Sequence, residues 1–207
     1  MPVPSAPPYE VVLPFPVARA KIPTTMNWRS TWVVSSIQSL KARGHFDKYS
    51  KLLGTTHRDA ILLAVAGMWL PIAVARAHYE ACDALGLPRS EQVEMGLAVG
   101  ERAQGTLLRT ATRVVTGSGV TPWTVVPQLQ RLWERGADGG GTSVLKVGPK
   151  EAIVETIGCE LFDVPYFRHA YAGVILGIVK LLCKRAYAHD ETAPLAQGEC
   201  ALRLQWA

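Results

Sequence analysis

The C-terminal end of this chain alternates apolar residues with polar or small ones. The apolar series is Cys200, Leu202, Leu204 and Trp206, and the intervening residues are Ala201, Arg203 and Gln205. A period of two is typical of a half-buried antiparallel strand, because successive side chains of a strand point to opposite faces of the sheet. The sequence therefore predicts a sheet with one apolar face in this part of the chain.

The residues before this strand continue the same pattern from Thr142 onward. A hairpin is predicted around Gly148-Pro149, with Val144–Val147 as one strand and Ala152–Ile157 as the other. A helix from Tyr166 to about Arg185 follows, and then a third strand over Ala186–His189 and a fourth over Glu199–Trp206. The expected order is strand, strand, helix, strand, strand.

Helices are expected before residue 142. From Asn27 onward apolar residues recur at helical spacing, and the apolar run Ile61–Ala75 predicts a long helix with a kink near Gly67–Pro71. Residues 1–26 are rich in proline and are expected to form an extended tail. The fold class is thus α+β: one domain over 27–207, with a helical part (27–138) packed on an antiparallel sheet of about four strands (142–207) that contains one long inserted helix.

Composition narrows the class of protein. The chain has 207 residues, 48% of them hydrophobic, and a net charge of +5, which fits one globular domain. Its basic residues are dispersed, so nucleic acid is not an expected partner. Four well-separated cysteines without a CxxC pair and the absence of a signal-peptide pattern predict a cytoplasmic protein. The run Ile61–Ala75 is too short to cross a membrane, so no transmembrane segment is expected.

Motifs for catalysis and metal binding are absent from the sequence. No HExxH pair, no G-x-S-x-G elbow and no His-Cys cluster at ligand spacing occurs. The sequence therefore favours a protein that is not an enzyme and that has no metal site.

Two clusters of aromatic and polar residues are candidates for a ligand pocket. The residues proposed to line it are Trp69, His78, Tyr79, Tyr166 and His169. Apolar and aromatic walls with a few polar tips are typical of small-molecule sites, although an aromatic core has the same composition. Haem would need an axial ligand such as His169 or His78. A lone histidine on an apolar helix is more often a hydrogen-bonded core residue, so no cofactor is expected.

Two segments resemble a known superfamily. "GPKEAIVETIGCELFDVPYFRHAYAGVILGIVKLL" and "GECALRLQWA" resemble the 4-vinyl reductase domain superfamily, which includes the haem-nitric-oxide-binding fold and the TRAPP subunits. "TPWTVVPQLQRLWERGADGGGTSVLKVGP" is similar to a bacterial paralogous family of unknown function. The resemblance covers roughly Gly54–Ala207 and implies an apolar cavity, hydrophobic or lipid-like ligands and dimerisation through helices. The Y-x-S-x-R motif of the haem-binding relatives is missing here.

These observations lead to one main hypothesis and two alternatives. The main hypothesis is a non-enzymatic, homodimeric module that binds a hydrophobic or lipid-like small molecule between the kinked helix and the sheet, as a sensor or scaffold. The first alternative is a haem-binding sensor or an enzyme that uses His169 or His78. The second is a protein–protein interaction subunit that binds partners through its proline-rich tail.

Overall fold

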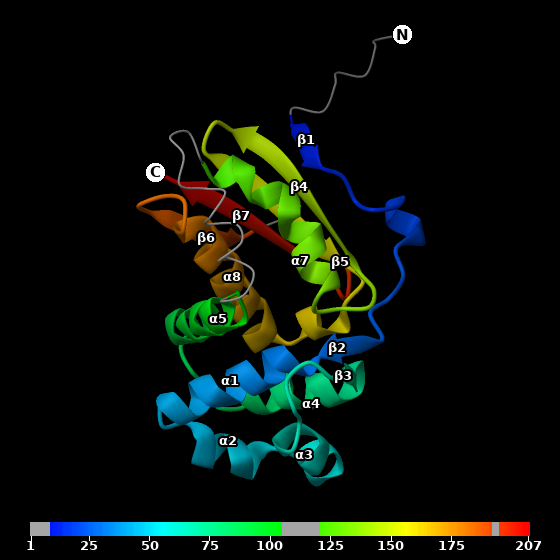
Figure 1. The fold of residues 1–207 in the computed structure, drawn as a ribbon, viewed down its shortest axis with the longest axis vertical. Coiled ribbons are helices and arrows are strands. Elements are labelled where there is room, and N and C mark those ends of the chain that lie inside the picture. The colour runs from blue at the N-terminus through cyan, green and yellow to red at the C-terminus, as the bar shows by residue number, and fades with distance from the viewer. Residues whose placement is uncertain (1–8, 105–120, 192–194) are drawn as a thin grey trace.

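The computed structural model describes residues 9–104, 121–191 and 195–207 (Figure 1). The α-helices are α1 (Ser30–Ala42), α2 (Phe46–Leu52), α3 (Thr55–Leu62), α4 (Ile72–Asp83), α5 (Arg89–Gln104), α7 (Leu129–Glu134) and α8 (Pro165–Lys180). The strands are β1 (Glu10–Leu13), β2 (Asn27–Arg29), β3 (Trp69–Pro71), β4 (Gly141–Gly148), β5 (Glu151–Ile157), β6 (Ala186–Asp190) and β7 (Cys200–Trp206). The α+β class predicted from the sequence is confirmed.

The main sheet is antiparallel and has the strand order β1-β4-β5-β7-β6. The strand β7 lies between β5 and β6, and Val144, Val154 and Leu202 occupy one row across three neighbouring strands. Along β7, the residues predicted to face the core are buried and Gln205 is exposed. The alternation in the sequence therefore identified an antiparallel strand correctly, and the structure shows that this strand is internal to the sheet.

The sheet has five strands rather than the expected four, because the proline-rich segment contributes one. Residues of β1 pair with β4, and Lys146 Nζ lies 2.7 Å from a carboxylate oxygen of Glu10. Pro14 and Pro16 follow β1 directly, and proline is tolerated at a sheet edge because it lacks a backbone donor. Whether residues 1–26 form a unit separate from the domain stays a prediction.

The long kinked helix predicted from Ile61 is wrong. The helix α3 ends at Leu62, and the chain then pairs β3 with β2 before α4 begins. Gly67 has a φ of +93°, which L-residues rarely adopt, and Pro71 precedes the first turn of α4. The apolar run therefore contains a turn and a short strand, which periodicity alone could not separate from a helix.

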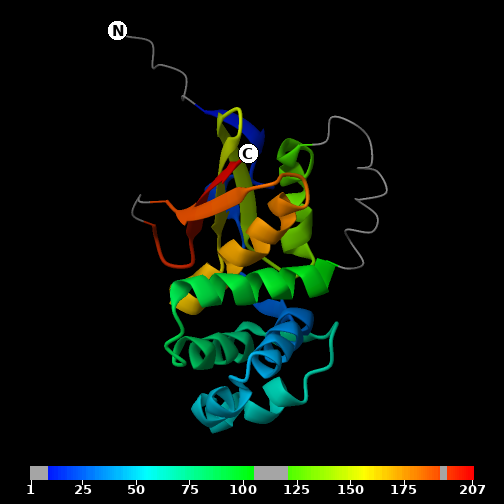
Figure 2. The same cartoon turned by 90° about the vertical axis from the view of Figure 1, so that its left-hand side faces the viewer.

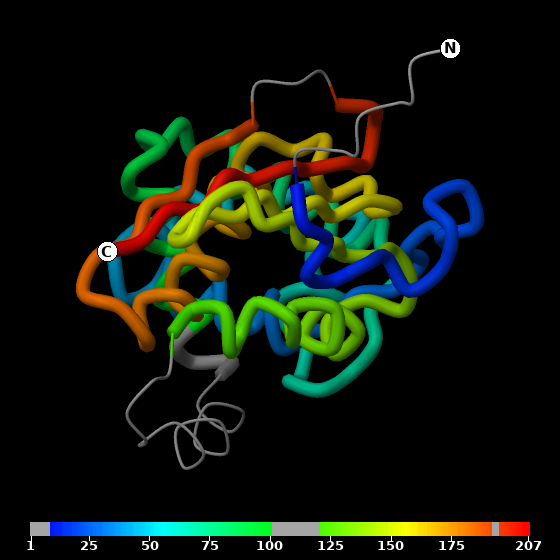
Figure 3. Tube along the Cα trace, turned by 90° about the horizontal axis from the view of Figure 1, so that it is seen from above, coloured from blue at the N-terminus to red at the C-terminus, as the bar shows by residue number. Residues whose placement is uncertain are grey.

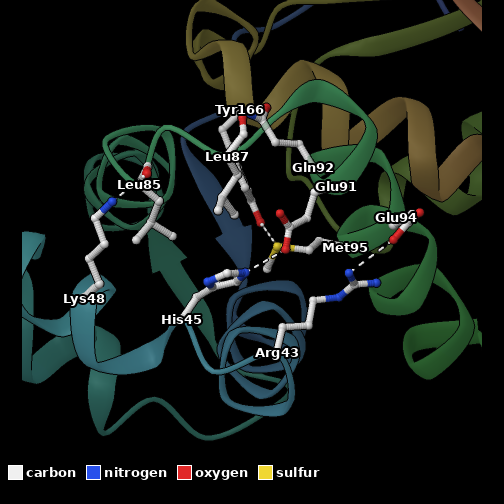
Figure 4. A network of polar contacts seen from close by, with 10 residues as sticks. All are labelled: Arg43, His45, Lys48, Leu85, Leu87, Glu91, Gln92, Glu94, Met95 and Tyr166. Atoms are coloured by element: carbon white, nitrogen blue, oxygen red, sulfur yellow. Dashed lines mark hydrogen bonds and ion pairs between the residues drawn. The ribbon is translucent and has the colours of Figure 1, made fainter.

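The helix α5 lies between two lobes (Figure 2). The helices α1 to α4 lie on one side of it, and the sheet with α7 and α8 lies on the other. When the molecule is viewed from above, α7 runs along the sheet (Figure 3). Polar contacts join α5 to the corner between α1 and α2: Arg43 lies 3.2 Å from Glu94, and His45 Nε2 lies 2.7 Å from Glu91 (Figure 4). The two lobes are thus connected through one shared helix.

The contact between α5 and α8 depends on small residues. A Cβ atom on Gly96 would overlap the carbonyl oxygen of Ala170 in α8, and a Cβ on Gly173 would overlap the carbonyl oxygen of Val93 in α5. The two helices therefore pack backbone against backbone. Within the described parts of the chain, no helix is long and apolar enough to span a membrane.

Candidate functional site

A cavity of about 50 Å³ lies between the two lobes. Its lining residues belong to β2, α1 and α4 on one side, to α5, and to α7 and α8 on the other side. The lining residues used below are Trp28, Trp32, Ser36, Tyr79, Trp133, Tyr166, Phe167, Tyr171 and Val174. Seven aromatic residues therefore line the cavity within the described chain, and they come from segments far apart in the sequence.

The rings around the cavity contact one another across the lobe boundary. The centroids of Trp28 and Phe167 are 5.5 Å apart at an interplanar angle of 77°, and those of Tyr79 and Phe167 are 4.7 Å apart at 64°. Trp28 and Trp133 are in edge contact at 5.6 Å. Edge-to-face pairs of this kind each add about 0.5–1.5 kcal/mol beyond the area they bury, so the cavity has stable walls.

Polar groups gather near Trp28 and Ser36. Burial raises the pKa of Tyr79, and the adjacent indole N–H of Trp28 opposes part of this rise. Burial also raises the pKa of Tyr166, whose hydroxyl lies beside Ser36 and 3.6 Å from the sulfur of Met95. The tyrosines are therefore neutral phenols at physiological pH.

Two of these polar atoms lack a hydrogen-bond partner. The indole nitrogen of Trp28 and Oγ of Ser36 are fully buried, and within the described chain neither completes a hydrogen bond. The hydroxyls of Tyr79 and Tyr166 and the thiol of Cys82 lie close to these atoms without reaching hydrogen-bond geometry. A buried donor without a partner costs about 1–3 kcal/mol, so this end of the cavity has unmet hydrogen-bonding capacity.

The pocket residues proposed from the sequence fall into separate places. Tyr79 and Tyr166 line the cavity. Trp69 lies on the surface with 39% of its area exposed, and the guanidinium of Arg29 lies 4.0 Å from its ring centroid. The structure therefore brings the two tyrosines together and leaves Trp69 outside.

The two candidate histidines do not line the cavity. His78 is completely buried; its Nδ1 lies 2.7 Å from the Tyr49 hydroxyl and its Nε2 lies 3.7 Å from the sulfur of Cys82. His169 is half-buried, with Nδ1 2.8 Å from Oε1 of Gln92, and burial lowers its pKa. His78 therefore contacts side chains of α2 and α4, and His169 contacts a side chain of α5.

Sequence reasoning missed much of the cavity wall. Trp28, Trp32, Trp133 and Phe167 were not among the pocket residues proposed from the sequence. Their spacing in the sequence does not predict that they contact one another, because β2, α7 and α8 are far apart along the chain and come together only in the folded structure. In the described chain, no group of three or more His, Cys, Asp or Glu residues could hold a metal ion.

Solved structures of H-NOX (haem-nitric oxide/oxygen binding) domains match 86% of this chain. No protein-family model and no curated protein matches the sequence. The chain thus has the H-NOX fold. The resemblance to the haem-nitric-oxide-binding fold is therefore supported by solved structures, and membership of the 4-vinyl reductase and TRAPP superfamily stays a prediction.

Three solved structures illustrate the similarity. An H-NOX protein from S. oneidensis in the Fe(II) ligation state has a TM-score of 0.61 at 8% identity, with 96% of that chain covered. An oxygen-binding H-NOX domain related to soluble guanylate cyclases, in its oxygen complex, has a TM-score of 0.56 at 12% identity and 94% coverage. A protein studied for haem redox potential and porphyrin distortion has a TM-score of 0.57 at 11% identity and 99% coverage.

These neighbours contradict the expectation that no cofactor is involved. Haem had little weight in the sequence because a lone histidine on an apolar helix is more often a hydrogen-bonded core residue, yet solved proteins that share this fold are haem proteins. The comparisons therefore favour the haem-sensor alternative over the lipid-like main hypothesis. The size and the lining residues of the cavity are therefore compared with what haem requires.

The residues around the cavity do not fit haem in the conformation described. Within the described lining, no residue is His, Cys or Met, which are the common axial ligands, and the three tyrosines are neutral. The undescribed stretch 105–120 contains no His, Cys, Met or Tyr in its sequence. A volume of about 50 Å³ is also well below the ~300–1,000 Å³ of sites for larger ligands. A porphyrin could enter here only if the lobes moved apart.

Proposed function

We propose that this chain is a ligand-binding sensor domain whose ligand is held between its two lobes. The observation that carries the proposal is the aromatic cavity, whose walls come from both lobes. A ligand that contacts both lobes stabilises one relative arrangement of them, and such differential binding is what a sensor requires. Haem, the ligand of the structural neighbours, is the first candidate to test.

The arrangement of α5 supports this proposal. This helix contacts α8 of the sheet lobe through Gly96 and contacts α1 and α2 through Glu91 and Glu94. A change in the cavity would therefore reach both lobes through one rigid element. Homodimer formation and a cytoplasmic location stay predictions that accompany the sensor role.

The experiment measures ligand binding with two probes. Haemin is followed by its Soret band and by quenching of the tryptophans that line the cavity; xenon, which enters dry apolar cavities, is followed by the rise in the unfolding temperature. We expect the wild-type chain to bind at least one probe in the cavity. The variant Val174→Phe places a ring there and should weaken that binding by tenfold or more.

The control is Val65→Phe, which adds the same ring at a position that is 66% exposed and outside the cavity. This control should bind both probes as the wild type does. One equivalent of haemin bound with tryptophan quenching supports the haem version, and xenon binding that only Val174→Phe removes supports a site for smaller ligands. Wild-type protein that binds neither probe, or Val174→Phe protein that binds as well as wild type, contradicts the proposal.

A further inference from the structure

We propose that the cavity directly binds a small uncharged molecule that carries a hydrogen-bond-accepting oxygen, with the indole N–H of Trp28 and the hydroxyl of Ser36 as its donors. This inference rests on the proposed location of the ligand site between the lobes. It adds the chemical class of the ligand for the closed cavity described, which is too small for haem.

The first argument is the chemistry of the unpartnered atoms. An indole N–H can only donate a hydrogen bond, so the missing partner of Trp28 must be an acceptor. Ser36 lies about one helix turn beyond Trp32 in α1, and its hydroxyl can rotate to donate a hydrogen bond. Both residues line the cavity, with 4% and 3% of their area exposed. An acceptor oxygen within reach of both atoms would satisfy the two donors.

The second argument is the absence of charge. Every described residue that lines the cavity is uncharged, and no Arg, Lys, Asp, Glu or His is among them. A charged ligand would be buried without a counter-charge, which is far more costly than burying a hydrogen-bonded neutral group. The ligand is therefore a neutral molecule.

The third argument is size. A buried water needs about 10–15 Å³ of the same kind of volume, so a cavity of about 50 Å³ holds roughly three to five non-hydrogen atoms. The rings of Trp133 and Phe167 and the side chain of Val174 supply apolar contacts on the walls. The ligand is therefore a short apolar body that ends in a carbonyl or ether oxygen.

Trp32 and Leu132 suggest where such a molecule enters. Both line the cavity and both are only half-buried, unlike Trp28 and Trp133. The Trp32 ring lies over Gly136, where a Cβ would be 2.5 Å from the indole nitrogen. Rotation of this one ring would open the wall without unfolding either lobe.

The experiment compares acetone with 2-methylpropene, which has the same shape and lacks the oxygen. The full-length chain is labelled with ¹⁵N, and each probe is titrated while the indole N–H signals of the six tryptophans are recorded. We expect acetone to move the Trp28 signal in a saturable way and to bind about fivefold more tightly than 2-methylpropene, as one added hydrogen bond predicts. The Trp123 signal should stay in place, because its N–H is bonded to the Pro149 carbonyl at 2.7 Å.

Variants assign the effect to the two donors. Trp28→Phe and Ser36→Ala should each remove most of the preference for acetone and leave the affinity for 2-methylpropene within twofold. The control Trp123→Phe should keep the full preference. Two donor variants are used because Trp28→Phe also shrinks a core side chain, whereas Ser36→Ala removes only a hydroxyl.

Two results would overturn the inference. The first is equal binding of acetone and 2-methylpropene. The second is a bound water that contacts the Trp28 N–H and is not displaced by acetone. The part of the cavity near Trp28 and Ser36 would then bind water only. If either occurs while xenon still binds in the cavity, the ligand class is wrong and the sensor proposal stands; if no probe enters the cavity, the sensor proposal fails as well.

Discussion

Replacement of Gly96 or Gly173 by alanine is expected to destabilise the fold by about 3 kcal/mol or more, whereas Gly177→Ala should change the free energy of unfolding by less than about 1 kcal/mol. All three changes add one methyl group to a helix. They differ only in the atoms that lie nearest to that methyl group.

The physical reason is the close crossing of α5 and α8. At Gly96 and Gly173 the new Cβ would overlap a carbonyl oxygen of the opposite helix, and backbone cannot move aside as a flexible side chain can. At Gly177 the nearest atoms are 3.9 Å away, which is ordinary van der Waals contact. There the higher helix propensity of alanine acts without a steric penalty.

Urea unfolding of the three variants, followed by circular dichroism, measures this difference. Because α5 joins the two lobes, the Gly96 and Gly173 variants should also lose ligand binding at temperatures where they remain folded. Equal stabilities for all three variants would show that α5 and α8 are further apart than described.

The second expected result is a loss of stability in mild acid caused by His78. Burial lowers the pKa of His78 in the folded state to about 3, from 6.5 for the free side chain. The unfolded chain therefore takes up a proton at a higher pH than the folded chain does. The contribution of neutral His78 to stability is complete above about pH 6.5 and is lost progressively as the pH falls towards 3.

The size of this effect follows from linkage. Between pH 7 and pH 5, the protonation of His78 in the unfolded state alone should lower the free energy of unfolding by about 2 kcal/mol. The folded state cannot accept the proton easily, because the ring lies between Tyr49 and Cys82 with no solvent contact.

The variant His78→Asn removes the titrating group and keeps an amide near the Tyr49 hydroxyl. Its stability should be lower at pH 7, and its loss between pH 7 and pH 5 should be smaller than that of wild type by about 2 kcal/mol. His189→Asn, at an exposed position of β6, is the control and should keep the wild-type slope. If His78→Asn and wild type lose stability in parallel, His78 is not the buried neutral group described.

The sequence predicted those parts of the fold whose signal is local. The alternation from Cys200 to Trp206 and the hairpin around Gly148-Pro149 each describe one element or two adjacent ones, and both appear as expected. The strand β1 was not foreseen, because its pairing with β4 joins residues more than 130 positions apart. Proline in its neighbourhood pointed to an extended tail, which is also the conformation of an edge strand.

The candidate site was harder to predict from the sequence, because it is formed by residues that are far apart along the chain. Tyr79 and Tyr166 were singled out by their polar tips, and they lie in the cavity wall. The tryptophans beside them were not, because a buried aromatic residue looks the same in a sequence whether it faces a core or a cavity. Haem was given little weight because a lone histidine is more often a core residue, whereas a fold can be shared with almost no sequence in common.

The most direct test of the account is a crystal structure of the wild-type chain under xenon pressure. The account predicts an anomalous xenon peak between the lobes, in contact with Trp133, Phe167 and Val174, and no such peak in crystals of Val174→Phe. A wild-type structure in which that space is filled by the chain's own side chains, with xenon absent or bound only elsewhere, would contradict the existence of a ligand site between the lobes.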